Sequence, residues 1–213
     1  MTHVSEIVFT LTKNEKIIIS IDIPLTEVNC CTETSIIFIQ KNHELVLTND
    51  SLFNNIKTMI VLLQKCINQA LLLDNTITKD IGYLFNQYSA IICGENLERP
   101  TFVTYIRKNN ELYWVGNDYQ LWSADYITWL YNCVDGSIIF EVTPFYPYMY
   151  CEPEEEPNYI SYEEWIKSYK PYFIATLSRE RAEEWLKQAE DIIKVIENNQ
   201  NRWELQSKVD AES

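Results

Sequence analysis

The sequence predicts an α+β protein in which antiparallel sheets pack against a central helix and an amphipathic C-terminal helix. Residues 1–50 alternate apolar and polar side chains with a period of two, which is typical of half-buried strands. Segments 50–73 and 178–198 instead repeat apolar residues every three or four positions, as the buried face of a helix does. Further strand-like runs fill residues 99–142, and no repeat or linker divides the chain, so we expect a single domain over 1–213.

The N-terminal strands are predicted to form a simple meander. Four strand-like segments follow one another, and they cover residues 7–12, 17–23, 35–40 and 44–48. The polar segments Lys13-Asn14-Glu15-Lys16 and Lys41-Asn42-His43 connect neighbouring segments in the way that hairpin turns do. Consecutive strands joined by such short turns are expected to pair as a four-stranded antiparallel sheet.

The two main helical segments each begin at a residue that favours helix capping. Asp50 or Ser51 can cap the central helix, and Ser178 can cap the C-terminal one. A polar tail follows Asn198, and we expect this tail to fray. A shorter apolar stripe within residues 80–89 predicts a second, brief helix.

The second half of the chain is punctuated by turn residues and prolines. Further strands are predicted over residues 101–107, 111–115, 119–123 and 137–142, with Asp135-Gly136 as the best two-residue turn signal. Segment 143–159 contains four prolines, which deny donors to any strand ladder, so it is predicted to be an extended loop. A helical turn over 162–167 and a last strand over 172–176 precede the C-terminal helix.

The charge balance argues against nucleic acids and membranes as partners. Lys and Arg number 17 against 31 Asp and Glu, which gives a net charge of −14 at pH 7. Binding phosphates requires clustered Lys and Arg, so this acidity favours a cationic protein partner. No run of about 18 clean apolar residues occurs, and the first residues do not resemble a signal peptide. We therefore expect a cytoplasmic protein whose six cysteines are reduced.

Glycine, histidine and cysteine usage argues against the common catalytic and cofactor sites. Only four glycines occur, no two of them close together, whereas a loop that cradles phosphates needs clustered glycines. His3 lies at the terminus, His43 lies in a predicted turn, and the cysteines lack the Cys-x-x-Cys spacing that suits zinc. We therefore expect no cofactor and no metal. An enzyme that acts on sugars through Asp125, Asp135 or Glu141 is an alternative, because such chemistry needs paired carboxylates near aromatic rings.

The best candidate for a binding site lies in the proline-broken segment 143–159. No regular face would bury all of its tyrosines, and exposed aromatic side chains are enriched in binding patches. An acidic run follows directly, and a solvated, inert loop is its alternative interpretation. The predicted partner-binding residues are Tyr146, Tyr148, Tyr150, Glu152, Glu154, Glu155 and Glu156.

In its general character the chain resembles the immunity proteins of bacterial polymorphic-toxin and contact-dependent-inhibition systems. The shared features are acidity, a compact α+β composition and an exposed segment rich in aromatic and carboxylate side chains. The resemblance implies a non-catalytic inhibitor of a basic toxin, with Tyr146, Tyr148 and Tyr150 as anchors. Glu152, Glu154, Glu155 and Glu156 would then stand in for the phosphates that the toxin's basic cleft binds. A self-associating adaptor protein is a further alternative.

Overall fold

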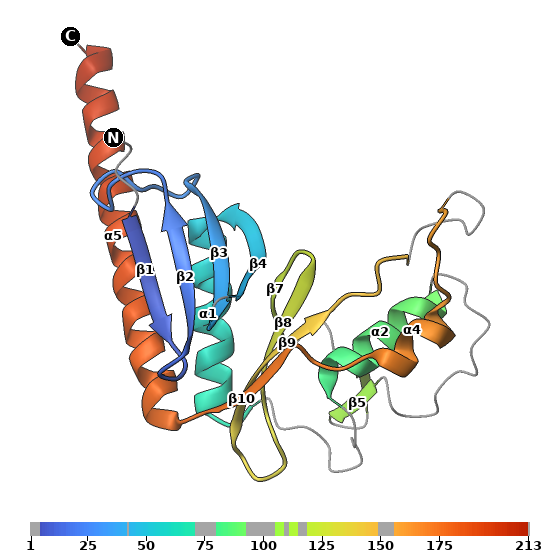
Figure 1. Ribbon diagram of the computed structural model, residues 1–213. Helices are drawn as coiled ribbons and strands as arrows, with labels where there is room; N and C mark the ends of the chain where they lie inside the picture. Colours follow the sequence, from blue (N-terminus) through green and yellow to red (C-terminus); the bar gives the residue numbers. More distant parts are fainter. Residues whose placement is uncertain are drawn as a thin grey trace.

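Within the residues that the computed structural model describes, two four-stranded antiparallel sheets and four helices confirm the predicted α+β class (Figure 1). The structure describes residues 5–41, 43–70, 80–92, 105–108, 111–114, 119–148 and 156–212. No helix in these ranges is both long enough and apolar enough to cross a membrane.

The first sheet is the predicted meander. Its strands are β1 (Ser5–Thr10), β2 (Glu15–Ile21), β3 (Glu33–Gln40) and β4 (His43–Ser51), paired in the order β1-β2-β3-β4. Both hairpin turns lie where the polar segments predicted them. In the first, Leu11 N donates to Glu15 O at 3.0 Å, and in the second, Lys41 adopts a left-handed conformation with φ of 54°.

Helices α1 (Leu52–Ile67) and α5 (Arg179–Glu212) pack side by side against the first sheet (Figure 1). The Ser51 hydroxyl accepts a hydrogen bond from Asn54 N at 3.2 Å, so it caps α1 as predicted. The expectation that the chain frays beyond Asn198 is wrong, because α5 continues to Glu212. This polar continuation contains neither Gly nor Pro, so nothing in it breaks the helix.

The second sheet has the order β10-β9-β8-β7. Its strands are β7 (Gln120–Ser123), β8 (Tyr126–Asn132), β9 (Ile138–Pro144) and β10 (Phe173–Leu177), and a separate hairpin joins β5 (Tyr105–Lys108) to β6 (Glu111–Trp114). The Asp135-Gly136 turn is confirmed between β8 and β9: Gly136 has φ of +84°, and Ser137 N donates to Asp135 Oδ1 at 2.9 Å. Strand β8 itself was not predicted, because it is buried on both faces and its sequence does not alternate.

Helix α1 joins the two sheets into one core. Side chains from both sheets, from α1 and from α5 form a single buried hydrophobic cluster. Trp122 Nε1 of β7 donates to Asn55 O of α1 at 3.4 Å, and Asn132 Nδ2 of β8 donates to Cys66 O at 3.0 Å. The Trp185 ring of α5 contacts Phe9 of the first sheet and Phe140 of the second, at centroid distances of 5.6 and 6.2 Å. The C-terminal helix therefore packs on the sheets as predicted, and on α1 as well.

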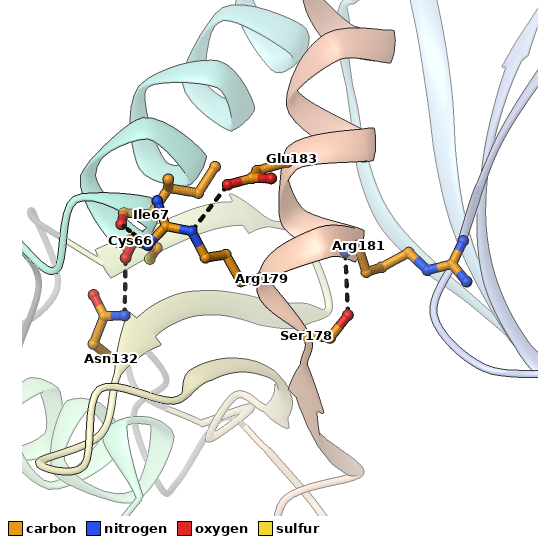
Figure 2. Close-up of polar contacts among 7 residues, drawn as sticks. All are labelled: Cys66, Ile67, Asn132, Ser178, Arg179, Arg181 and Glu183. Carbon is orange, nitrogen blue, oxygen red and sulfur yellow. Dashed lines mark hydrogen bonds and ion pairs between the residues drawn. The ribbon is translucent and has the colours of Figure 1, made fainter.

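The end of α1, the end of β8 and the start of α5 meet at one point (Figure 2). Beside the Asn132 bond to Cys66 O, Arg179 Nη1 donates to Ile67 O at 3.2 Å. The Arg179 bond satisfies a carbonyl in the last turn of α1, where a helix leaves carbonyls unpaired, and the Asn132 bond adds to the one that Cys66 O accepts from Gln69 N. The predicted Ser178 cap is confirmed here, because its hydroxyl accepts from Arg181 N at 3.1 Å.

Helices α2 (Ile81–Ile92) and α4 (Tyr162–Ser168) form a smaller unit beside β9, away from α5 (Figure 1). Both were predicted as short helical segments. The prediction of an extended loop over 143–159 is wrong at its start, since Thr143 and Pro144 pair with β8 as the last residues of β9. Residues 145–148 and 156–159 contain no helix or strand, and 149–155 lie outside the described residues.

Candidate functional site

Tyr146, the first of the predicted anchors, is buried. Its side chain is 1% exposed, and its ring packs against Tyr162 and Trp165 at centroid distances of 5.5 and 5.4 Å. The backbone N–H donates to Asn86 Oδ1 at 2.8 Å, and the phenol donates to Ile160 O at 2.7 Å. The backbone N–H and the phenol hydroxyl of Tyr146 therefore both have hydrogen-bond partners inside the protein. It supports the α2–α4 unit and offers no surface to a partner in this structure, which corrects its predicted role as an exposed anchor.

Tyr148 and Glu156 are the predicted site residues that the structure places at the surface. Tyr148 is half-buried, and its ring lies 5.8 Å from Tyr146 and 5.5 Å from Tyr159. Glu156 is exposed, three residues before Tyr159. The other predicted residues, Tyr150, Glu152, Glu154 and Glu155, lie outside the described residues.

The sequence interpretation missed the contribution of α4 to this surface. Trp165 is half-buried, and Ile160 remains 43% exposed just before the helix. Ser161 caps α4 by accepting from Glu164 N at 3.3 Å, which places Glu163 and Glu164 in the exposed first turn. The Ser-x-x-Glu spacing of residues 161–164 is a capping signal that agrees with the helical turn predicted over 162–167.

We call this region the aromatic–acidic surface. It comprises Tyr148, Tyr159, Ile160 and Trp165 together with the exposed carboxylates of Glu156, Glu163 and Glu164. Lys167 Nζ approaches Glu164 Oε2 at 2.6 Å, but both side chains are about two-thirds exposed. Such solvated pairs contribute little free energy, so the surface keeps its acidic character.

A buried carboxyl group lies where β9 meets α2. Glu141 is fully buried, with Tyr131 Oη donating to Oε2 and Gly82 N donating to Oε1, each at 2.8 Å. Burial raises the pKa of Glu141 to about 8, and the nearby Asp80 carboxylate adds to this rise. Asp80 in turn accepts from Tyr83 N and from Tyr169 Oη, each at 2.7 Å. The hydrogen bonds of Glu141 therefore connect the start of α2 to the second sheet, and the bond from Tyr169 to Asp80 connects the end of α4 to the start of α2.

The three carboxylates of the enzyme alternative do not converge. Asp125 lies in the β7–β8 turn and Asp135 in the β8–β9 turn, so the length of β8, about 20 Å, separates them. Both are exposed, and Asp135 bonds locally to Ser137, whose side-chain hydroxyl and backbone N–H lower the pKa of Asp135. Glu141 is the remaining acid, and it has no exposed surface.

The described cysteines and histidine form no cluster that could hold a metal. Cys30 and Cys31 are exposed, Cys66 is buried and Cys133 is half-buried, and all four are free thiols. Within the described ranges, no group of three or more His, Cys, Asp or Glu side chains could hold a metal ion. Cys93, Cys151 and His3 lie outside the described residues.

The chain matches no protein-family model, no curated protein and no solved structure. The proposals that follow therefore depend on the chemistry of the surfaces themselves.

Proposed function

We propose that this protein is a non-catalytic inhibitor that binds and blocks a basic partner protein, such as a toxin domain. The observation that carries the proposal is the aromatic–acidic surface, where the Tyr148 and Tyr159 rings lie 5.5 Å apart beside the exposed Glu156. Tyrosine and tryptophan are among the residues most enriched at binding hot spots.

The surface is held in place before any partner arrives. Tyr146 and Tyr162 are buried beneath it and form edge-to-face ring contacts, and Tyr146 also hydrogen-bonds to Ile160 O. A partner would bind aromatic side chains whose positions are already fixed by the core. Binding to such a surface loses less conformational entropy than ordering a mobile loop does.

The distribution of charge favours a basic partner. The chain carries a net charge of −14. Glu156 is exposed three residues before Tyr159, and Glu163 and Glu164 are exposed in the first turn of α4, next to Trp165 in the sequence. Complementary charges at the rim of an interface mainly accelerate association, whereas central aromatic contacts mainly slow dissociation. The proposal therefore predicts that the two kinds of side chain have separable kinetic effects.

The test uses binding kinetics with the protein that co-purifies with the tagged full-length chain. Tyr148→Ala should raise the dissociation rate by about tenfold or more, as loss of a hot-spot ring does. The double variant Glu156→Lys/Glu163→Lys should slow association and weaken its dependence on salt. The matched control is Glu33→Lys/Glu44→Lys, which makes the same change in net charge at exposed positions of the first sheet.

Three outcomes would contradict the proposal. The first is a co-purifying partner that is itself acidic, and the second is wild-type dissociation of Tyr148→Ala. The third is equal slowing of association by the two double variants, because it would show that total charge matters and that the aromatic–acidic surface does not.

A further inference from the structure

A second surface feature lies at the opposite end of the molecule from α4, between the edge strand β1 and helix α5 (Figure 1). It is a groove of about 560 Å³. Its apolar lining comes from three segments and consists of Ile7, Val8, Leu25, Ile192 and Val195. Side chains from β1, from the connection after β2 and from α5 therefore form one continuous apolar strip.

Several apolar side chains of this strip remain accessible to solvent. Val8 is 37% exposed, Leu25 is 38% exposed and Val195 is 37% exposed. Single exposed apolar residues are common on protein surfaces, but a group of them in one groove is typical of an interaction site.

An added β-strand does not fit this groove. The outward-facing carbonyls of β1 would have to accept hydrogen bonds from such a strand. Two of them are already used by α5: Gln188 Nε2 donates to Val8 O at 3.2 Å, and Trp185 Nε1 donates to Thr10 O at 3.1 Å. The side chains of α5 thus occupy the edge that strand addition would need.

The dimensions of the groove suit a helix instead. Its α5 wall runs from Glu184 to Val195, which is about 17 Å or three helical turns. Amphipathic helices bind apolar grooves through side chains spaced at i, i+3 or i+4, and i+7. A helix of three turns is long enough to include the positions i, i+3 or i+4, and i+7.

The charges at the rim favour a cationic helix. Glu6, Glu184 and Asp191 line the groove against the single amine of Lys187. Glu184 and Asp191 do form ion pairs on α5, with Arg181 at 2.8 Å and Lys194 at 2.9 Å. All four of these side chains are at least 40% exposed, so the pairs are weak and leave both carboxylates able to meet another cation.

We infer that the β1–α5 groove is a docking site for a basic amphipathic helix of a partner protein, about three turns long. Its apolar stripe would lie along Val8, Leu25 and Val195, and its flanking Lys or Arg side chains would face Glu6, Glu184 and Asp191. This inference goes beyond the proposed function, because it concerns a different surface.

The probe is a fluorescent 14-residue peptide of Leu and Lys with leucines at i, i+3, i+4 and i+7, tested against the full-length protein. A peptide of the same composition in scrambled order controls for charge. Val195→Asp should weaken binding of the striped peptide at least tenfold, although it makes the protein more acidic. Val134→Asp is the matched control, since it adds the same charge at a 58% exposed position in the β8–β9 turn and should leave binding unchanged or slightly stronger.

Circular dichroism and thermal melting establish that each variant is folded, and Leu25→Asp replaces Val195→Asp if the latter is not. Equal affinity of the striped and scrambled peptides would overturn the inference, and so would equal affinity of the Val195→Asp and Val134→Asp variants. Tyr148→Ala should bind the striped peptide like the wild type. Weaker binding in that variant would place the peptide on the aromatic–acidic surface and would also overturn the inference, whereas the kinetic test with the natural partner is unaffected by these results.

Discussion

Glu141 shows how one buried carboxyl group can connect parts of the molecule that are distant in sequence. It accepts hydrogen bonds from Tyr131 on β8 and from Gly82 at the start of α2. The approach of α2 to β9 is close, since a Cβ atom at Gly82 would lie 2.2 Å from Thr143 Cγ2. The backbone of α2 thus lies directly against the sheet, and the carboxyl group is sealed from water, which disfavours its ionised form.

This burial predicts a specific dependence of stability on pH. The pKa of Glu141 is about 8 in the folded protein against an ordinary value of 4.5, so the folded state holds a proton that the unfolded state releases between these values. Stability from this group is complete below pH 4.5 and is lost as pH rises through 8. Glu141→Gln cannot ionise and should therefore be less sensitive to pH over this range.

The measurement is urea unfolding of wild type and Glu141→Gln at several pH values from 5 to 9. The free energy of unfolding of the variant relative to wild type should rise from pH 5 to about pH 8 and then level off. Asp80→Asn is a second informative variant, because removing the neighbouring carboxylate should lower the pKa of Glu141. Its loss of stability with rising pH should therefore end at a lower pH than in the wild type. Parallel curves for wild type and Glu141→Gln would show that Glu141 is ionised in the folded protein throughout.

At the scale of elements, α5 depends on its apolar face rather than on its charges. The face includes Trp185, Ala189 and Ile196, all buried, whereas its ion pairs are exposed and weak. Trp185 contacts Phe9 of the first sheet and Phe140 of the second at centroid distances of 5.6 and 6.2 Å. It therefore holds α5 against both sheets at once.

Replacing Trp185 by Ala should accordingly be costly. The change removes a fully buried ring, leaves a cavity and leaves Thr10 O without its donor, so we expect a loss of about 3 to 5 kcal/mol in the free energy of unfolding. Leu205→Ala on the same helix is the control, because this side chain is 65% exposed and its loss should cost less than about 0.5 kcal/mol. Denaturant unfolding of both variants compares them, and equal small losses would mean that α5 is held by other contacts.

The elements that could be predicted from the sequence are those with one buried face. Helix α1 and strands β1 and β3 show the period of their secondary structure, because one side faces the core and the other is more exposed. Strand β8 lies between β7 and β9 and contacts α1, so nearly all its side chains are buried and the period disappears. The end of α5 was missed for the opposite reason, since a helix without an apolar face has no signal of this kind.

The candidate site shows the same limit more sharply. The sequence singled out segment 143–159, but it did not indicate which of its tyrosines is buried. Tyr146 is held inside by Asn86, which lies 60 positions earlier in the chain, and by Ile160, which lies 14 positions later. Trp165 of α4 packs on Tyr146, and Tyr159, which precedes α4, packs on Tyr148. Only tertiary contacts decide such exposure, so local patterns could not have revealed it.

At the scale of the whole molecule, α1 is the element on which the main core depends. It packs on α5 and on strands of both sheets, so the two sheets share one hydrophobic cluster. Cys66 lies at the end of α1 within this cluster, and it is 1% exposed. Its carbonyl accepts a hydrogen bond from Asn132 of the second sheet, so the surroundings of Cys66 depend on α1 and the second sheet staying together.

The reactivity of the Cys66 thiol should therefore report opening of the entire core. Burial raises its pKa to about 12, so both access and thiolate formation are suppressed in the folded state. Labelling by a thiol reagent at neutral pH should be slow at Cys66 and fast at the exposed Cys31, with peptide mapping by mass spectrometry to separate them. As urea is added, the Cys66 rate should rise in parallel with the unfolded fraction, because only the open state reacts. If Cys66 instead labels at a rate that does not depend on urea, then α1 separates from the second sheet locally, and the two sheets do not unfold as one unit.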